Sequence, residues 1–182
     1  MIDIHCHMLP GIDDGARDMS AALDMAKLAV ASGITHTVCT PHIYPGLYEN
    51  TVDGIARATS ALRLALEGAD IPLTVSYGAD IQIVPELVRG LQAGTLPTLH
   101  GSRYFLFEPP HHIRPPGLLE LLQSALAVGF VPVITHPERL TWVESAYDQF
   151  VEAAQMGAWV QLTGGSLTGV WGPRVRAISE RF

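Results

Sequence analysis

The chain of 182 residues carries 11 Lys and Arg against 18 Asp and Glu, which gives a formal net charge of −7. Hydrophobic residues make up 48% and charged residues 16% of the chain, a balance typical of globular rather than disordered proteins. The negative charge and the absence of any basic run argue against nucleic-acid binding through a broad basic face. The length suits one domain, two cysteines are too few for a disulfide framework, and the first residues lack the pattern of a signal peptide. We therefore expect a cytoplasmic protein without membrane insertion.

Segments with strand-like and helix-like periodicity alternate along the chain. In chain order we expect a strand at 2–6, a helix at 18–32, a strand at 34–40, a helix at 52–67, a strand at 73–77, a helix at 85–92, a strand at 104–108, a helix at 118–128, a strand at 131–135, a helix at 146–156, a strand at 159–163 and a helix at 172–182. Repeated strand–helix units predict parallel strands joined by helical crossovers. An eight-unit barrel typically needs about 250 residues, so the pattern leaves open a doubly wound sheet or a barrel whose last part is absent.

Metal-ligating residue types recur where successive expected strands end. They are His5 and His7, His42, Asp80, Glu108 and His136. In a parallel barrel all these positions lie at the carboxyl ends of the strands, where such enzymes hold their active sites. A mixed set of histidines and carboxylates suits Mn²⁺, Fe²⁺ or Zn²⁺. The set exceeds the ligands that one ion uses, so we expect two or more ions.

The first expected strand carries the sharpest signal. Residues i and i+2 of a strand point to the same face, so His5 and His7 can reach one ion while Cys6 points away. In the loop that follows, one of Asp13 and Asp14 is a candidate further ligand. Two metal ions can generate hydroxide and bind the oxygens of an in-line displacement at phosphorus.

Arg139 lies three residues after His136, where its guanidinium could bind a phosphoryl oxygen. A thiol phosphatase instead needs a nucleophilic cysteine with an arginine six residues further on. That position holds Ile12 after Cys6 and Pro45 after Cys39, so neither cysteine fits that mechanism. A surface salt bridge is the alternative role for Arg139.

The opening motif and three later ones resemble a known family. The segments Ile2-Asp-Ile-His-Cys-His-Met-Leu-Pro-Gly-Ile-Asp-Asp-Gly15, Thr40-Pro-His42, Tyr77-Gly-Ala-Asp80 and Thr135-His-Pro-Glu-Arg139 are similar in order to motifs of the PHP (polymerase and histidinol phosphatase) family. More narrowly, they resemble the bacterial CpsB/CapC-type tyrosine-protein phosphatases of capsule and exopolysaccharide biosynthesis. The resemblance implies an α/β fold, a distorted (β/α)7 PHP-type barrel, and a cluster of two or three divalent ions, manganese first and iron or zinc as alternatives. It also implies hydrolysis of phosphotyrosine on the tail of a cognate bacterial tyrosine kinase.

Carried over residue by residue, the resemblance implies seven metal ligands and two residues in catalysis. The ligands are His5, His7, Asp14, His42, Asp80, Glu108 and His136, and the catalytic residues are Arg139 and Asp14. The family has Glu where this chain has Asp80, which is one methylene shorter. The family also closes with an Asp-x-His motif on its last strand, and residues 1–182 do not reach that motif, so we expect them to form a single PHP-type metallophosphatase domain that lacks its C-terminal βα unit.

Three functions stay open at this point. The first is a metal-dependent protein-tyrosine phosphatase. The second is another PHP or amidohydrolase-like metallohydrolase acting on a small phosphate ester, and the third is a non-catalytic metal-binding remnant. The expected partner is the phosphotyrosine-bearing tail of a kinase rather than nucleic acid, with a homo-oligomer as a further option.

Overall fold

The computed structural model describes residues 1–84 and 86–182 and shows an α/β protein built on parallel strands. The chain divides into two compact units, Met1–Leu106 and Phe107–Phe182. Strand β6 (Tyr104–Glu108) runs from the first unit into the second.

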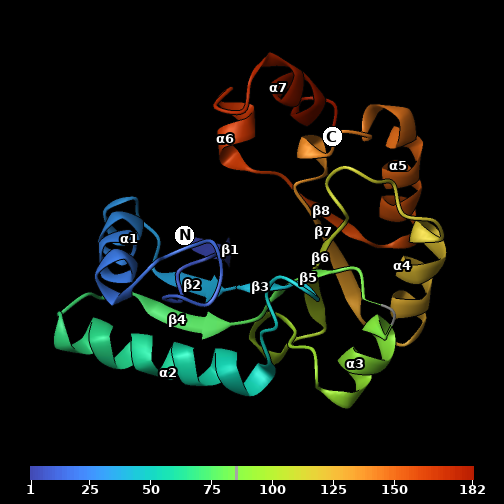
Figure 1. Ribbon diagram of the computed structural model, residues 1–182. Coiled ribbons are helices and arrows are strands. Elements are labelled where there is room, and N and C mark those ends of the chain that lie inside the picture. Colours follow the sequence, from blue (N-terminus) through green and yellow to red (C-terminus); the bar gives the residue numbers. More distant parts are fainter. Residues whose placement is uncertain (85) are drawn as a thin grey trace. The chain divides into compact units, whose positions relative to one another are not determined.

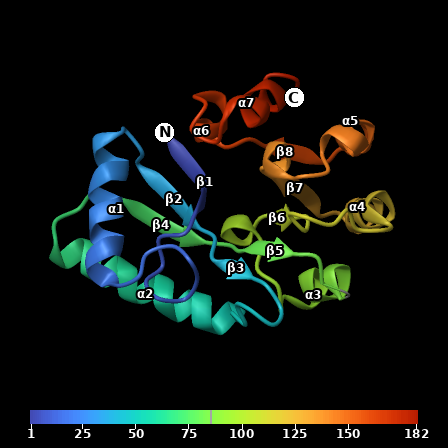
Figure 2. The ribbon, with the colours of Figure 1, turned by 45° about the horizontal axis from the view of Figure 1, so that its top comes forward.

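In the first unit, helices pack beside a parallel sheet. Strands β1 (Ile2–Cys6), β2 (His36–Cys39) and β4 (Thr74–Tyr77) form this sheet, and β3 (His42–Ile43) and β5 (Asp80–Gln82) pair with each other in a second sheet. The helices of this unit are α1 (Met19–Ala31), α2 (Val52–Gly68), α3 (Leu87–Ala93) and the short 3₁₀ helix η1 (Leu99–Gly101). The sheet has the order β1-β2-β4, and α2 packs against both β4 and α1 (Figures 1 and 2).

Both long helices of the first unit begin at capped residues. The Asp18 carboxylate accepts a hydrogen bond from the Ala21 N–H at 2.8 Å, and the Thr51 hydroxyl accepts one from the Gly54 N–H at 3.2 Å. Each cap satisfies a backbone donor that the first turn of a helix leaves without an intrahelical partner. The buried stripe of α2 consists of Ile55, Thr59, Leu62 and Leu66. This stripe has the 3.6-residue period that predicted the helix.

The short strands β3 and β5 were not expected from the sequence. Pro41 has no N–H to donate, yet its carbonyl still accepts a hydrogen bond from the Asp80 N–H at 3.1 Å. The ladder therefore continues past the proline, and His42 pairs with Asp80 in parallel register. This pairing brings the two residues, 38 positions apart in sequence numbering, side by side.

The second unit repeats the strand–helix pattern. Besides the end of β6, its strands are β7 (Val131–Thr135) and β8 (Trp159–Gln161), which pair in parallel. Its helices are α4 (Leu118–Ala127), η2 (Pro137–Arg139), η3 (Glu144–Ala146), α5 (Tyr147–Met156), α6 (Gly164–Leu167) and α7 (Pro173–Ser179). Helix α4 packs against β7 and α5, and α5 packs against β8 (Figure 1). The core of this unit includes the fully buried Phe107, Leu122, Ile134 and Phe150.

The alternation of strands and helices expected from the sequence is confirmed, with shifts at the ends of elements. The strands at 2–6, 104–108 and 131–135 have the expected bounds, whereas the strand expected at 34–40 covers only His36–Cys39. Helix α6 was not expected, and the last helix is shorter than the predicted 172–182. Pro85, expected to open a helix, lies outside the described residues. Among the described residues, no helix combines the length and apolar character needed to cross a membrane.

Candidate metal centre

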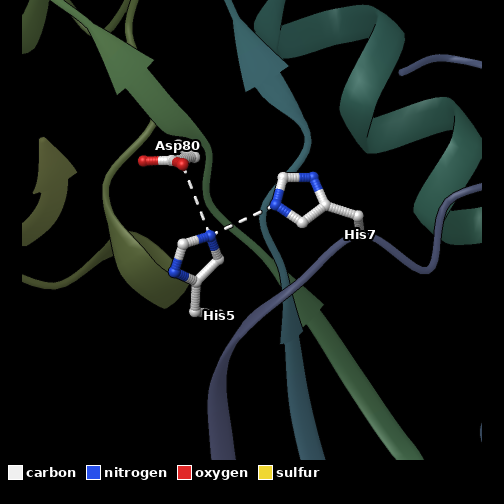
Figure 3. Close-up of side chains that lie close together, drawn as sticks. All are labelled: His5, His7 and Asp80. Atoms are coloured by element: carbon white, nitrogen blue, oxygen red, sulfur yellow. Dashed lines mark hydrogen bonds and ion pairs between the residues drawn. The ribbon is translucent and has the colours of Figure 1, made fainter. Parts of the chain in front are cut away.

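The imidazole rings of His5, in β1, and of His7, just after it, lie close to each other, and His5 faces Asp80 at the start of β5 (Figure 3). The two Nε2 atoms are 3.2 Å apart, and His5 Nε2 is 3.3 Å from Asp80 Oδ2. Asp80 is fully buried, and the His5 side chain is 10% exposed. The three residues thus aim ligand atoms at one small volume that is largely shielded from solvent.

These distances suit a divalent ion. Ligand atoms held about 2.1 Å from one ion lie roughly 3.0 to 3.4 Å apart, the lower value for octahedral and the higher for tetrahedral geometry. The separations of 3.2 and 3.3 Å among His5, His7 and Asp80 fall inside that range. Two neutral imidazole nitrogens and one carboxylate oxygen are also the donor types that bind Mn²⁺, Fe²⁺ and Zn²⁺. The residues present therefore fit a transition-metal site.

Asp13 contacts the His7 ring at Nδ1, the ring nitrogen other than the one that lies near His5. Its Oδ2 accepts a hydrogen bond from His7 Nδ1 at 2.7 Å and from the His42 N–H at 3.2 Å, and its Oδ1 accepts one from the Gly15 N–H at 3.0 Å. Burial alone would raise the pKa of Asp13, but these hydrogen bonds outweigh it and hold that pKa below its usual value. A proton fixed on Nδ1 leaves Nε2 of His7 as the metal-binding atom, an arrangement common around protein-bound metals.

The residues alone leave one of Asp13 and Asp14 as the candidate ligand in this loop, and the resemblance selects Asp14; neither assigns Asp13 the orienting role that it has here. The two aspartates are adjacent, so only the turn geometry separates them. Gly15 shows how tight that turn is, because a Cβ atom there would lie 2.0 Å from the His7 carbonyl oxygen. The neighbouring glycine was the available signal that the backbone passes close to the first strand.

Asp14 and His42 form a second group with His7. Asp14 Oδ1 lies 3.5 Å from His42 Nε2 and 4.0 Å from His7 Nδ1, and the Asp14 side chain is 63% exposed. The Tyr48 ring stacks on His42 with centroids 5.6 Å apart. Burial, the largest influence, lowers the pKa of His42, which keeps the ring neutral and able to bind metal at neutral pH.

His42 Nδ1 also lies 3.7 Å from Asp80 Oδ2. The same carboxylate oxygen is 3.3 Å from His5 Nε2, so Asp80 faces a histidine on either side. A carboxylate so placed can serve more than one ion, even though aspartate is shorter than the glutamate of the family pattern. The first unit therefore brings together all of its five predicted ligands: His5, His7, Asp14, His42 and Asp80.

In the second unit, the expected residues also gather at strand ends. Glu108 ends β6 and His136 follows β7, and Glu108 Oε1 lies 3.7 Å from His136 Nε2. His136 has φ 33° and ψ 51°, a left-handed conformation that is unusual for a residue with a Cβ atom. Such strain costs about 1–3 kcal/mol and concentrates at functional sites.

Arg139 ends the turn that begins at His136. Its N–H donates to the His136 carbonyl at 3.0 Å, and its guanidinium carbon lies 4.3 Å from the centroid of the Trp171 ring. Between the two, Glu138 is fully buried, a feature that the sequence did not reveal. Its Oε1 accepts hydrogen bonds from the Thr163 N–H at 2.9 Å and the Ser166 hydroxyl at 2.8 Å.

The cysteines are unsuited to nucleophilic chemistry. Burial, followed by the nearby charges of Asp3 and Asp13, raises the pKa of Cys6 to about 12. Cys39 is fully buried, and burial raises its pKa as well. The thiolate is the reactive form of cysteine, and neither residue forms it appreciably near neutral pH.

A sequence profile described as "Capsular polysaccharide synthesis, CpsB/CapC" matches residues 1–182. The chain belongs to the CpsB/CapC family. It is 37% identical over 182 residues to the tyrosine-protein phosphatase YwqE of Bacillus subtilis, covering 100% of this chain and 72% of YwqE. It is 30% identical over 182 residues to the putative tyrosine-protein phosphatase CapC of Staphylococcus aureus, covering 100% of this chain and 71% of CapC.

The fold agrees with this CpsB/CapC membership. A crystal structure from work on YwqE of Bacillus subtilis and CpsB of Streptococcus pneumoniae superimposes on this chain with a TM-score of 0.95 and 37% sequence identity. The match covers 100% of this chain and 73% of that one. Those two proteins are described as unique metal-dependent tyrosine phosphatases. The α/β fold with parallel sheets is therefore that of a CpsB/YwqE-type protein.

Proposed function

We propose that this chain is a metal-dependent protein-tyrosine phosphatase. The observation that carries the proposal is the convergence of His5 Nε2, His7 Nε2 and Asp80 Oδ2 on one small volume. It occurs in a CpsB/CapC chain that is 37% identical to a tyrosine-protein phosphatase. The high pKa of the buried thiols supports a metal-based reaction over a cysteine-based one.

The substrate in this proposal is phosphotyrosine on the tail of a bacterial tyrosine kinase that controls capsule or exopolysaccharide synthesis. The family's link to capsular polysaccharide synthesis supports that assignment. We further propose a distorted PHP-type barrel and a cytoplasmic location, where a kinase tail would be accessible. The similarity to a crystal structure from work on YwqE and CpsB, with a TM-score of 0.95, supports the barrel.

Two or three divalent ions, manganese first, would be held by the predicted ligands. These are His5, His7, Asp14, His42, Asp80, Glu108 and His136. Bound ions of this kind lower the pKa of water to near neutrality and stabilise negative charge on the oxygens of an in-line displacement at phosphorus. Neutral histidines are required for this binding, and the lowered pKa of His42 meets that requirement at neutral pH.

The chain's own residues then bind and orient the substrate. Arg139 offers a planar set of N–H donors that matches two phosphoryl oxygens. Asp14 places one carboxylate oxygen 3.5 Å from His42 Nε2. Because this side chain is 63% exposed, its other oxygen can accept a hydrogen bond from the attacking water and orient it.

The test is phosphate release from a phosphotyrosyl peptide and from the matched phosphoseryl peptide. The proposal expects hydrolysis of the phosphotyrosyl peptide that a chelator abolishes and added Mn²⁺ restores. Hydrolysis of small phosphate esters alone would indicate the second function considered above. Metal binding without any turnover would indicate a non-catalytic remnant, and either outcome would overturn the proposal.

A further inference from the structure

Arg139 is packed against an indole rather than extending freely into solvent. The guanidinium carbon lies 4.3 Å from the Trp171 ring centroid, well within the distance at which a cation is attracted to an aromatic face. Stacking covers one face of the guanidinium but leaves the N–H groups at its edge available. That edge is the part of arginine that binds two phosphoryl oxygens.

Trp171 also packs closely against a glycine. A Cβ atom at Gly165 would lie 3.3 Å from Trp171 Nε1 and 3.5 Å from Val170 Cβ, so the indole packs closely over this residue of α6. The Val170 N–H also donates to the Gly165 carbonyl at 2.9 Å. The indole thus rests on a short, backbone-bonded turn although Trp171 is 49% exposed.

The turn that contains α6 is hydrogen-bonded to Glu138, the residue beside Arg139. The fully buried Glu138 uses Oε1 to accept hydrogen bonds from the Thr163 N–H and the Ser166 hydroxyl, which flank the start of α6. These two hydrogen bonds tie the turn to Glu138, since breaking either one would leave a polar group without its partner. Glu138 therefore holds α6, α6 contacts Trp171, and Trp171 contacts Arg139, which is the neighbour of Glu138 in sequence.

We propose that Trp171 is a positioning residue that orients the Arg139 guanidinium for phosphoryl binding. The inference rests on the proposed function of Arg139 as the phosphate contact. An unsupported arginine has many side-chain conformations, and ordering it on binding phosphate costs free energy. Because the Trp171 indole already restricts the Arg139 side chain before phosphate binds, less conformational entropy is lost on binding.

Affinity for inorganic phosphate, measured calorimetrically on the Mn²⁺-loaded protein, tests the inference without depending on turnover. Trp171→Ala should weaken phosphate binding roughly 3- to 30-fold, the range that cation–π energies imply. Trp171→Phe, which keeps an aromatic face, should restore affinity to within about threefold of the original protein. Val170→Ala is the matched control, because Val170 is 74% exposed in the same turn and should leave affinity unchanged.

A double-mutant cycle separates positioning from general structural damage. In an Arg139→Ala background, Trp171→Ala should cause no further loss of phosphate affinity, because the group it orients is gone. An equal loss in both backgrounds, or unchanged affinity in Trp171→Ala alone, would overturn the inference. If the original protein binds phosphate but hydrolyses no phosphotyrosine, the proposed function fails while this cycle still decides the role of Trp171.

Discussion

Replacing Asp13 with asparagine tests how the His7 ring is oriented. Asp13 has a fully buried side chain and accepts hydrogen bonds from His7 Nδ1, the His42 N–H and the Gly15 N–H at 2.7, 3.2 and 3.0 Å. The amide of Asp13→Asn can still accept the bond from Gly15. Its NH₂ group would then face the donors of His7 and His42, so two hydrogen bonds to a charged acceptor are lost.

The expected loss of metal affinity follows from these contacts. Hydrogen bonds to charged groups contribute roughly 1.5 to 3 kcal/mol each. Removing a carboxylate that orients a metal-binding histidine typically lowers affinity about 10- to 100-fold, or about 1.4 to 2.7 kcal/mol. We therefore expect Asp13→Asn to bind Mn²⁺ about 10- to 100-fold more weakly, measured by competition with a chromogenic chelator.

Two comparisons make the result interpretable. Asp24→Asn removes an exposed carboxylate that contacts Lys27 at 3.0 Å, and it should leave Mn²⁺ affinity unchanged. His5→Ala removes a direct ligand atom and should abolish binding. Unchanged affinity in Asp13→Asn would refute the orienting role, whereas a loss as complete as in His5→Ala would make Asp13 a ligand.

The pH dependence of stability gives a second measurement on the same residue, made on metal-free protein. Hydrogen bonding holds the pKa of Asp13 below its usual value despite burial. A lowered folded-state pKa stabilises the protein above the unfolded pKa, near 3.9, and this stabilisation disappears as the pH falls through the lowered value. The difference in unfolding free energy between the original protein and Asp13→Asn should therefore be constant from pH 7 to about 5 and narrow below about 4. A difference that does not change with pH would contradict this assignment.

Three further predictions concern the rest of the site. Gly15→Ala should lower the melting temperature and weaken metal binding, because its Cβ atom would lie 2.0 Å from the His7 carbonyl oxygen; a scan showing an unchanged melting temperature would contradict the loop geometry. Chelation should abolish hydrolysis while iodoacetamide has little effect, since burial raises the pKa of Cys6 to about 12 and Cys39 is fully buried. Complete inhibition by alkylation with metal retained would disprove this. Arg139→Lys should reduce kcat/KM by about 10- to 100-fold with metal content unchanged, because lysine lacks the planar, parallel N–H pair that a guanidinium offers to two oxygens. Equal kcat/KM values would exclude the bidentate contact.

The sequence predicted most of the fold because local signals and tertiary contacts agree. Asp18 and Thr51 each precede an apolar stripe, and both cap the helices that follow. Strands β3 and β5 escaped prediction because Pro41 normally ends a strand, and only the pairing of His42 with Asp80 shows that the ladder continues.

Only the part of the candidate site that follows a local rule could be predicted from the sequence. Alternation along a strand is a local rule, so His5 and His7 could be placed on one face from the sequence alone. The role of Asp13 depends on the turn at Gly15, and the burial of Glu138 depends on contacts with Ser166, 28 residues away. Neither arrangement leaves a periodic pattern in the sequence.

The position of a bound manganese ion shows whether His5, His7 and Asp80 form a metal site. Anomalous X-ray scattering from crystals grown with Mn²⁺ locates the ion without reference to activity. We expect a strong peak about 2.1 Å from His5 Nε2, His7 Nε2 and Asp80 Oδ2. Manganese bound elsewhere, with none among these three atoms, would contradict this expectation.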